Sequence, residues 1–485
     1  LFLTVWAWWF FFVSRRNNSG VLPPGPRPLP VVGNIFQLDK NPHRCLAKLA
    51  QQYGPLMSLR FGSVYTVVVS SPEMAREVLQ KHDLAFSSRT IVAAGEAHDH
   101  HKLAMGFMPV GDKWRSIRKL CKEQVFSLGR LEASQSLREE KLRKLVDYVG
   151  ECGRGGRAVG IGEAAFITTL NLMSATLFSA EFAVFDSDSG QEFKETIEGI
   201  ATVLGVPNLA DSFPILKPFD PQGIKKKAGF YFGKLLAMIG ELIDERKKSR
   251  SGNDYSRKQD FLEALLDCSE NELTIDEMKH LLMDFLVAGT DTTSSTTEWA
   301  MAELLKHPEK LKKTQREIRS IVGSNERIRE SDISKLPYFQ AVIKEVFRLH
   351  PPAPLMIPHK SESDVEVGDY TIPRGTQVLI NVWALGRDPK IWERPDSFEP
   401  ERFLNSNKKM DFKGQNFELI PFGSGRRICP GLPLADRMVH IMVASLLHQF
   451  DWKLDAGMSP EMVDRAEKFG LSLTKLVPLK AIPLK

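Results

Sequence analysis

The sequence predicts a mainly α-helical fold with small β-sheets, arranged as one large domain. Apolar residues recur at helical spacing in five long segments, at residues 131–148, 223–248, 275–306, 338–349 and 434–449. Two shorter stretches, residues 58–69 and 370–380, alternate well enough to form a strand pair each, and Gly or Pro bounds both of them. No internal repeat or second linker interrupts residues 34–485, so we expect a single domain there.

Composition is that of an ordered globular protein, with 42% hydrophobic and 26% charged residues in 485. The net charge of +5 is mild and includes no Lys/Arg tail, so nothing indicates nucleic-acid binding. Such a charge suits an anionic membrane surface or an acidic protein partner.

The N-terminal segment is interpreted as a membrane anchor followed by a hinge. Residues 1–13 are apolar except for Thr4, and Arg15 and Arg16 follow them. Thirteen residues are fewer than the roughly 20 that cross a bilayer, so we expect a truncated anchor with the domain on the cytoplasmic side. A cleaved signal peptide is disfavoured because no small-residue cleavage site follows. Residues 14–33 are basic and Pro-rich, which predicts a semi-rigid spacer.

The segment at residues 275–306 predicts the central helix. Thr274 and Glu277 have the spacing of a capping box at its start, and Pro308 follows its end. Its middle is apolar or small on nearly every face, which is typical of a helix buried through the centre of a large domain.

Cys429 carries the strongest chemical signal. The five cysteines are scattered and odd in number, which indicates a reducing compartment and no disulfide framework. Cys429 lies on a Gly-rich turn just before a helix, whose N-terminus is expected to lower the pKa of the thiol. A lone thiolate of this kind suits axial ligation of haem iron.

This segment has three other interpretations. A buried cysteine without a function is the commonest. A dinucleotide fingerprint beginning at Gly423 and Gly425 fails because Ile428 occupies the place of its third glycine. A zinc site would need a second Cys or His at ligand spacing.

Residues 422–431 resemble the haem-binding signature of the cytochrome P450 family, Phe-x-x-Gly-x-Arg-x-Cys-x-Gly. The fixed positions are Phe422, Gly425, Arg427, Cys429 and Gly431. The resemblance runs from the Pro-rich segment to the C-terminus. It implies the single-domain cytochrome P450 fold, with haem b (iron protoporphyrin IX) buried between the central helix and the cysteine loop. Cys429 would be the axial iron ligand, and Phe422 and Arg427 would contact the cofactor.

Asp291 and Thr292 resemble the acid–alcohol pair that delivers protons to bound oxygen in this family. We expect the Thr292 hydroxyl to bond to the carbonyl of Ala288, and Gly289 to leave room for a diatomic ligand. The alternative is a Thr-rich stretch of buried helix that is tolerated for packing.

Other residues resemble the family's supporting groups. Glu345, Arg348 and Arg402 match its structural Glu-Arg-Arg triad. Trp114 and Arg118 resemble its propionate-binding pair. His359 occupies a propionate-binding position that often holds Arg, where a His would be pH-sensitive. The histidines at positions 98–101 have no evident metal-ligand partners and are expected on the surface.

A stripe formed by Arg115, Lys119 and Lys122 is either a solvated face or a docking surface. The resemblance implies a partner for it, because electrons from NADPH would arrive through NADPH–cytochrome P450 reductase. Oxygen would be the second substrate.

Residues 164–174 and 218–223 resemble plant microsomal members of the family that oxidise terpenoids, among them ferruginol synthase and geraniol hydroxylase. The resemblance implies a monooxygenase at the endoplasmic reticulum membrane that hydroxylates an apolar terpenoid, of abietane diterpenoid type or alternatively a geraniol-type monoterpenoid. The expected pocket residues are all apolar: Met105, Phe107, Phe285, Ala288, Leu355, Met356 and Phe469.

Two rival functions remain open. A haem-thiolate isomerase or dehydratase would lack the acid–alcohol pair, so Asp291 and Thr292 disfavour it. A haem sensor or terpenoid carrier would need no reductase, so turnover with NADPH and reductase separates it from an enzyme.

Overall fold

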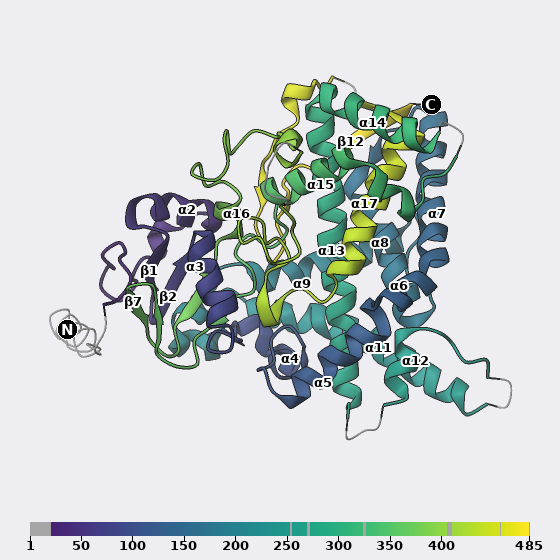
Figure 1. The fold of residues 1–485 in the computed structure, drawn as a ribbon. Coiled ribbons are helices and arrows are strands. Elements are labelled where there is room, and N and C mark those ends of the chain that lie inside the picture. Colours follow the sequence, from purple (N-terminus) through teal and green to yellow (C-terminus); the bar gives the residue numbers. More distant parts are fainter. Residues whose placement is uncertain are drawn as a thin grey trace.

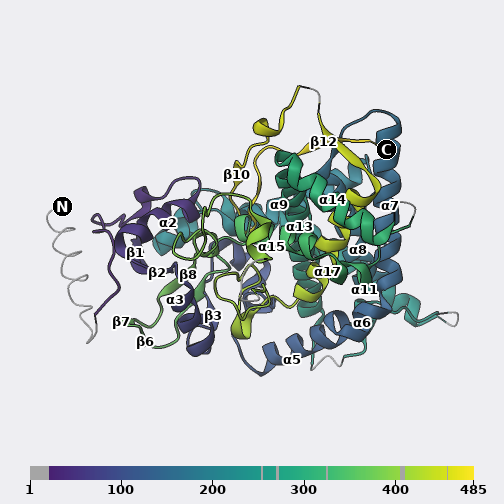
Figure 2. The ribbon, with the colours of Figure 1, turned by 45° about the horizontal axis from the view of Figure 1, so that its top comes forward.

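The computed structural model describes residues 21–252, 255–268, 272–323, 326–404, 410–455 and 457–484. The predicted anchor at residues 1–13 and the first part of the hinge lie outside the described residues. The fold is mainly helical with small sheets, as predicted. A sheet-rich part on one side adjoins a larger helical part (Figures 1 and 2).

The central helix is α13 (Ile275–Lys306), and it has the predicted bounds. Both bonds of the capping box between Thr274 and Glu277 are present. The helices α8 (Ile161–Phe178), α15 (Pro337–Leu349) and α17 (Leu432–Gln449) pack around it, and the α11 helix (Ile224–Arg250) crosses nearby (Figure 1). Burial of the middle of α13 by these neighbours explains why it has no polar face.

One predicted helix, at residues 131–148, is divided in the structure. The chain forms α6 (Leu128–Ala133) and α7 (Gln135–Arg154), and Ser134 between them leaves helical geometry at ψ 8°. The Ser134 hydroxyl donates to the Leu131 carbonyl and accepts a bond from the Arg138 guanidinium, so its side chain is engaged at the break.

The main sheet has the strand order β1-β2-β8-β5-β3. Its antiparallel pair β1 (Leu56–Phe61) and β2 (Val64–Val69) is the pair predicted at residues 58–69. The expected pair at residues 370–380 is wrong. Strand β7 (Tyr370–Ile372) pairs with β6 (Val365–Val367), whereas β8 (Gln377–Ile380) runs parallel to β2. Pro373 lacks an amide donor and follows β7 directly, so the chain leaves one sheet and joins the other.

The remaining elements complete the domain. The helices are α2 (Pro42–Tyr53), α3 (Pro72–Arg76), α4 (His100–Leu103), α5 (Asp112–Cys121), α9 (Asp188–Gly205), α10 (Leu209–Ser212), α12 (Phe261–Leu266), α14 (Pro308–Val322) and α16 (Val382–Leu385). The strands are β3 (Ser88–Arg89), β4 (Val159–Gly160), β5 (His359–Lys360), β9 (Asp451–Leu454), β10 (Glu467–Lys468), β11 (Thr474–Lys475) and β12 (Lys480–Leu484).

The described part of the Pro-rich segment lies along β1 instead of standing clear of the domain. The backbone N–H of Ser58 donates to the Pro24 carbonyl at 2.8 Å, and its hydroxyl donates to the Pro23 carbonyl at 2.7 Å. A Cβ atom on Gly25 would lie 1.8 Å from the Ser58 carbonyl oxygen, so glycine is required for this close approach. This part of the expected spacer therefore belongs to the surface of the domain.

Among the described residues, α8 is the one helix long and apolar enough to cross a bilayer. Because 78% of it is buried inside the protein, it is a core helix. It packs closely against α13 at Gly289, where an added Cβ atom would lie 2.9 Å from Cε of Met173. The expectation that Gly289 leaves room for a diatomic ligand is therefore wrong, because the space beside this glycine is filled by a methionine.

Candidate haem and proton-delivery site

The cysteine loop is held by backbone contacts. The N–H of Cys429 donates to the carbonyl of Phe422 at 2.9 Å, which closes residues 422–429 into a loop. Gly425 has a φ of 65°, and a Cβ atom there would lie 1.9 Å from the Leu79 carbonyl oxygen. This glycine is thus required both by its left-handed backbone and by the segment packed against it.

Cys429 is half-buried just before α17. Burial raises the pKa of its thiol, while the backbone amides of Gly431 and Leu432 and the charge of Arg118 lower it, and the net shift is upward. The expected lowering by the helix N-terminus is present but is outweighed by burial. A coordinated metal cation deprotonates a thiol outright, so a thiolate here fits an iron ligand.

Three arginines, Arg89, Arg118 and Arg427, converge beside this loop. Arg118 donates to the Ile428 carbonyl, Arg427 to the Ser87 carbonyl at 2.8 Å, and Arg89 to the Ile357 carbonyl at 2.6 Å. Burial lowers the pKa of Arg89 to about 9, and the nearby charge of Arg427 lowers it further. Burial likewise lowers the pKa of Arg427 to about 10, together with the charge of Arg118.

Among the ion pairs of the described residues, none joins a carboxylate to any of these three guanidinium groups. Nε of Arg89 is buried and has no hydrogen-bond partner. Clustered cations without acidic partners fit a dianionic ligand, and the two propionates of haem supply that charge. Sequence reasoning missed Arg89, because β3 brings it to the site from a segment without a motif.

Trp114 and His359 both border the arginine cluster. The indole N–H of Trp114 donates to the Met105 carbonyl at 3.2 Å, and the Arg118 and Arg427 guanidinium carbons lie 5.2 and 4.9 Å from its ring centre. Nδ1 of His359 bonds to the Phe86 carbonyl at 2.7 Å. Burial and the Arg89 charge hold the pKa of His359 well below its usual value. The expected pH sensitivity of His359 near neutrality is therefore wrong.

The central helix exposes a narrow stripe opposite its buried faces. Ala288 is exposed and Thr292 is half-buried, although most neighbouring residues of α13 are buried. The Thr292 hydroxyl donates to the Ala288 carbonyl at 2.7 Å, as predicted. Asp284 is half-buried one turn before Ala288 and accepts a bond from the Gly106 amide at 3.3 Å. These residues form one face of the helix at four-residue spacing.

Asp291 lies on a neighbouring face of α13 and is buried. Burial raises the pKa of its carboxyl to about 6. It lines a cavity of about 20 Å³ together with Phe469, Ser472 and residues of α9. An acid with this pKa exchanges its proton readily near neutral pH, which suits proton delivery.

The expected pocket residues occupy different surroundings. Met105 and Phe107 are buried beside α4, and Met356 approaches the cysteine loop at Gly423. The ring of Phe285 packs against Phe126 and Phe261, and that of Phe469 stacks on His43. Leu355 packs on the apolar cluster under β1 and β2.

A polar group beside this region was missed by sequence reasoning. His100 is buried, so the expected surface location is wrong for this histidine. Its Nδ1 lies 2.9 Å from Nδ1 of His280, and its Nε2 lies 3.4 Å from the Asp284 carboxylate. Burial raises the pKa of Asp284 to about 7 and lowers that of His100 to about 3. The signal that could have found the group is the i, i+4 spacing of His280 and Asp284 on the central helix.

Glu345, Arg348 and Arg402 meet behind the cysteine loop. Arg348 makes two 2.7 Å bonds to the Glu345 carboxylate, and Arg402 adds one at 3.1 Å. Arg348 also donates to the carbonyls of Gly386 and Ser397, which ties the chain after α15 to that helix. The structure thus brings the three predicted triad residues together in one ion-paired cluster.

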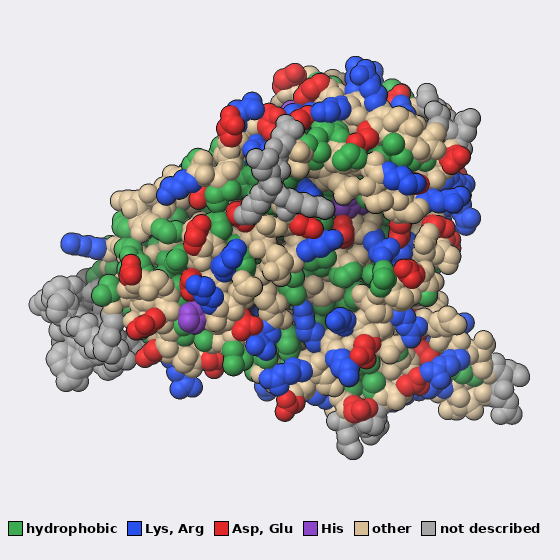
Figure 3. Space-filling view, in the orientation of Figure 1, with side chains coloured by type: hydrophobic (Ala, Val, Ile, Leu, Met, Phe, Trp, Pro, Cys, Tyr) green, Lys and Arg blue, Asp and Glu red, His purple; other side chains and the backbone are tan. Residues whose placement is uncertain are grey.

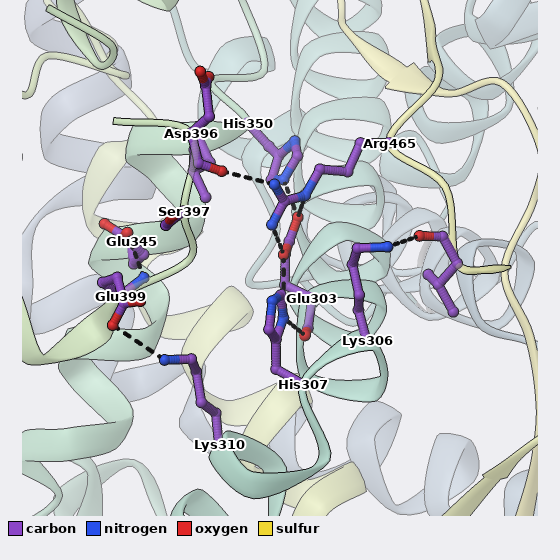
Figure 4. Close-up of polar contacts among 12 residues, drawn as sticks. Glu303, Lys306, His307, Lys310, Glu345, His350, Asp396, Ser397, Glu399 and Arg465 are labelled. Carbon is purple, nitrogen blue, oxygen red and sulfur yellow. Dashed lines mark hydrogen bonds and ion pairs between the residues drawn. The ribbon is translucent and has the colours of Figure 1, made fainter. Parts of the chain in front are cut away.

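A second buried network fixes the C-terminal end of α13. The Glu303 carboxylate accepts bonds from His350 at 2.7 Å and from Arg465 through two bonds of 2.7 Å (Figure 4). His350 stacks on Trp299 with ring centres 3.9 Å apart. The network joins the central helix to the segment that follows α15 and to the C-terminal segment before β10.

Comparison with known proteins decides the family. The family model described as "Cytochrome P450" matches residues 23–479. The chain belongs to the cytochrome P450 family. This cytochrome P450 is 55% identical to a ferruginol synthase from Isodon rubescens over 98% of the chain and 96% of that relative. It is 53% identical to a sugiol synthase from Salvia miltiorrhiza (100% and 98%) and 49% identical to a carnosic acid synthase from Rosmarinus officinalis (100% and 98%).

Membership assigns the class of chemistry. The protein is a monooxygenase, an oxidoreductase with a haem iron cofactor that uses O2 and a redox partner. The geometry fits this cofactor, since a lone cysteine on a glycine loop and a cluster of arginines without acidic partners lie together.

Proposed function

We propose that this cytochrome P450 hydroxylates an apolar abietane-type diterpenoid of the ferruginol pathway. The observation that carries the proposal is its similarity, over nearly full length, to relatives named ferruginol synthase, sugiol synthase and carnosic acid synthase. Ferruginol, sugiol and carnosic acid share one tricyclic abietane skeleton. The apolar side chains of Met105, bonded through its carbonyl to Arg427, and of Met356, beside Gly423, are consistent with such a hydrocarbon body.

Different residues have different roles in the proposed reaction. Haem, when bound through Cys429, supplies the oxygen activation. Arg89, Arg118 and Arg427 would hold its propionates, with Trp114 and His359 at their side. Thr292 would move a proton at its hydroxyl, and Asp291 would resupply that proton from its carboxyl. Ala288, with no more than a methyl group, leaves space on the same face of α13 for the substrate.

Electrons are proposed to come from NADPH through NADPH–cytochrome P450 reductase. Arg115, Lys119 and Lys122 are all exposed on α5 and the π-helix (Lys122–Phe126) that continues it, and blue side chains gather over this part of the face in Figure 3. A basic surface suits an acidic partner. We further propose that residues 1–13 anchor the protein in the endoplasmic reticulum membrane with its domain in the cytoplasm.

The test is product analysis of microsomes that contain the protein and reductase. Abietane hydrocarbons and phenols and geraniol-type monoterpenes would be supplied with and without NADPH. We expect NADPH-dependent hydroxylation of an abietane, and no product from a Cys429→Ala variant, which should also lose the thiolate-type carbon monoxide difference spectrum. Oxidation of monoterpenes alone would contradict the abietane assignment, and binding without turnover would indicate a carrier or sensor.

A further inference from the structure

A small, partly open cavity lies beside Asp291. It is about 20 Å³ in volume and is lined by residues of α9, α13 and the 468–474 segment. A cavity needs roughly 10–15 Å³ and polar partners to hold a water molecule. This one offers the polar groups of Asp291, Glu198, Lys468, Ser472 and Thr474. It is therefore large enough for a single water, for which the carboxylate of Asp291 offers a hydrogen-bond partner.

At its inner end the cavity is lined by the Asp291 carboxyl group, one oxygen of which has no hydrogen-bond partner among the described residues. Asp291 is 5% exposed, and its Oδ2 has no hydrogen-bond partner among the described residues. An unpartnered buried carboxylate oxygen is unfavourable unless a water or a proton satisfies it. Interaction with the Ser472 hydroxyl and the charges of Lys468 and Lys194 lower the pKa of Asp291, and Glu198 raises it, but burial has the largest effect.

The outer end of the space reaches solvent. Lys468 on β10 and Glu198 on α9 form an ion pair at 3.4 Å, with side chains 47% and 37% exposed. Both residues line the cavity that Asp291 also lines. A carboxylate that meets bulk water on one side and a buried water on the other can take up protons and pass them inward.

The walls of the space are rigid, so its size is built into the fold. The Leu471 amide donates to the Ala201 carbonyl on α9 at 2.9 Å. A Cβ atom on Gly205 would lie 2.0 Å from the Leu471 nitrogen, so α9 and the C-terminal segment are in close contact. On the α13 side, the Ser295 hydroxyl donates to the Leu473 carbonyl at 3.1 Å.

We propose that Glu198 takes up protons from solvent and passes them to Asp291 through a water in this cavity, and that Lys468 positions the Glu198 carboxylate. Glu198 takes a proton from bulk water and gives it to the cavity water. That water gives a proton to the Asp291 carboxylate, which replaces the proton that Asp291 has passed to Thr292. One proton moves inward for each transfer and no electron moves. The inference rests on the proposed role of Asp291 and adds the route from solvent.

The test compares Glu198→Gln with Glu195→Gln, which changes an exposed carboxylate of the same helix. We expect Glu198→Gln to lower kcat about tenfold and to increase its solvent deuterium isotope effect with KM unchanged, because a general acid–base step contributes about 10²-fold or more and neighbouring water compensates in part. Glu195→Gln should behave as wild type. Equal kcat and isotope effect in wild type and Glu198→Gln would overturn the proposal.

A second readout does not depend on turnover. The infrared carboxylic-acid band of Asp291, assigned by its loss in Asp291→Asn, reports the protonation of that side chain. Because the Glu198 charge raises the pKa of Asp291, Glu198→Gln should move the titration of this band to lower pH. An unmoved titration would show that the two carboxyls do not share the cavity.

A third variant removes the water without changing a charge. Ala201 lines the cavity, so Ala201→Val should fill it and reproduce the slower kcat and larger isotope effect. Wild-type kinetics in a folded Ala201→Val variant would overturn the water route. Failure of this inference can be told from failure of the proposed function by the Thr292→Ala variant. If only the Glu198 route is wrong, Thr292→Ala still consumes NADPH without forming product. If the proposed function is wrong, Thr292→Ala does not have this effect.

Discussion

At the scale of single residues, Thr292 shows how a helix backbone can fix the position of a hydroxyl. Its Oγ1 donates to the Ala288 carbonyl, which fixes the rotamer and leaves the hydroxyl oxygen as an acceptor. Thr292→Ala should therefore keep the fold and lower product formed per NADPH consumed by about tenfold or more, since a positioned proton donor contributes 10²–10⁴-fold. Thr292→Ser, which keeps the hydroxyl, is the matched control. NADPH consumption and product would be measured together, and unchanged coupling in Thr292→Ala would contradict the proton-delivery role.

Single residues also show which features of the site can be predicted from the sequence and which cannot. The signature around Cys429 and the hydrogen bond from Thr292 to the carbonyl four residues earlier are local patterns, so the sequence predicts both. The sign of the Cys429 pKa shift could not be predicted, because burial depends on segments distant in sequence. The close contact of Gly289 with Met173 could not be predicted either, because Met173 comes from another helix. The position of Arg89 could not be predicted because a short strand at the edge of a sheet brings it to the site.

At the scale of elements, helices were predicted better than strands. The bounds of α13 and α15 follow from a cap, a proline and a continuous periodicity, all of which are local. Strands β7 and β8 were both found, but their partners β6 and β2 could not be inferred from alternation alone. The break between two helices at Ser134 could not be predicted, because the helical spacing of apolar residues continues across it.

The contact of α9 with the C-terminal segment should depend on one glycine. Gly205→Ala would place a Cβ atom 2.0 Å from the Leu471 nitrogen, and backbone cannot move aside as a side chain can. We expect a loss of about 1–3 kcal/mol in the free energy of unfolding. Gly229→Ala in α11 is the matched control, because its Cβ atom would meet nothing within 4 Å and helix propensity should stabilise it by up to about 1 kcal/mol. Denaturant unfolding measures both, and equal stability of the two variants would show that α9 is free to shift.

The Glu303 network should set the acid stability of the joint between α13 and the C-terminal segment. Burial alone raises the pKa of Glu303, but His350 and Arg465 together hold it well below 4.5. A depressed carboxyl pKa stabilises the fold above the unfolded pKa, and the stabilisation is lost as pH falls below about 4.5 toward the folded value. Arg465→Leu should therefore destabilise the protein by about 3–5 kcal/mol at pH 7, and by less as the pH falls below 4.5.

Thermal or denaturant unfolding across pH 3–7 checks the prediction for Arg465. Arg143→Leu removes an exposed arginine from α7 and should leave the free energy of unfolding nearly unchanged. If Arg465→Leu were no less stable than Arg143→Leu at neutral pH, the network would contribute nothing to the joint.

At the scale of the whole molecule, the polar residues buried in the core and the charged residues on the surface lie in different places. The helical core around α13 buries Asp291, whereas Thr292 is half-buried. Helix α5 carries Trp114 and Arg118 on its inner face and Arg115 and Lys119 on its outer face. One short helix thus connects the buried arginine cluster, through Arg118, with the exposed Arg115 and Lys119. A partner docked there would lie close to the cysteine loop, to which Arg118 is bonded.

Reversing the outer charges should weaken that docking and leave the core untouched. We expect the triple variant Arg115→Glu, Lys119→Glu, Lys122→Glu to raise the KM for reductase about tenfold at low salt. The effect should shrink as salt rises, because exposed charges are screened. The control carries the same charge change on α11, as Lys226→Glu, Lys227→Glu, Lys247→Glu, all exposed positions. Turnover driven by a peroxide, which needs no reductase, should be equal in both variants and wild type. A loss of peroxide-driven turnover would place the defect in the fold, and an unchanged KM for reductase would leave the stripe as an ordinary solvated face.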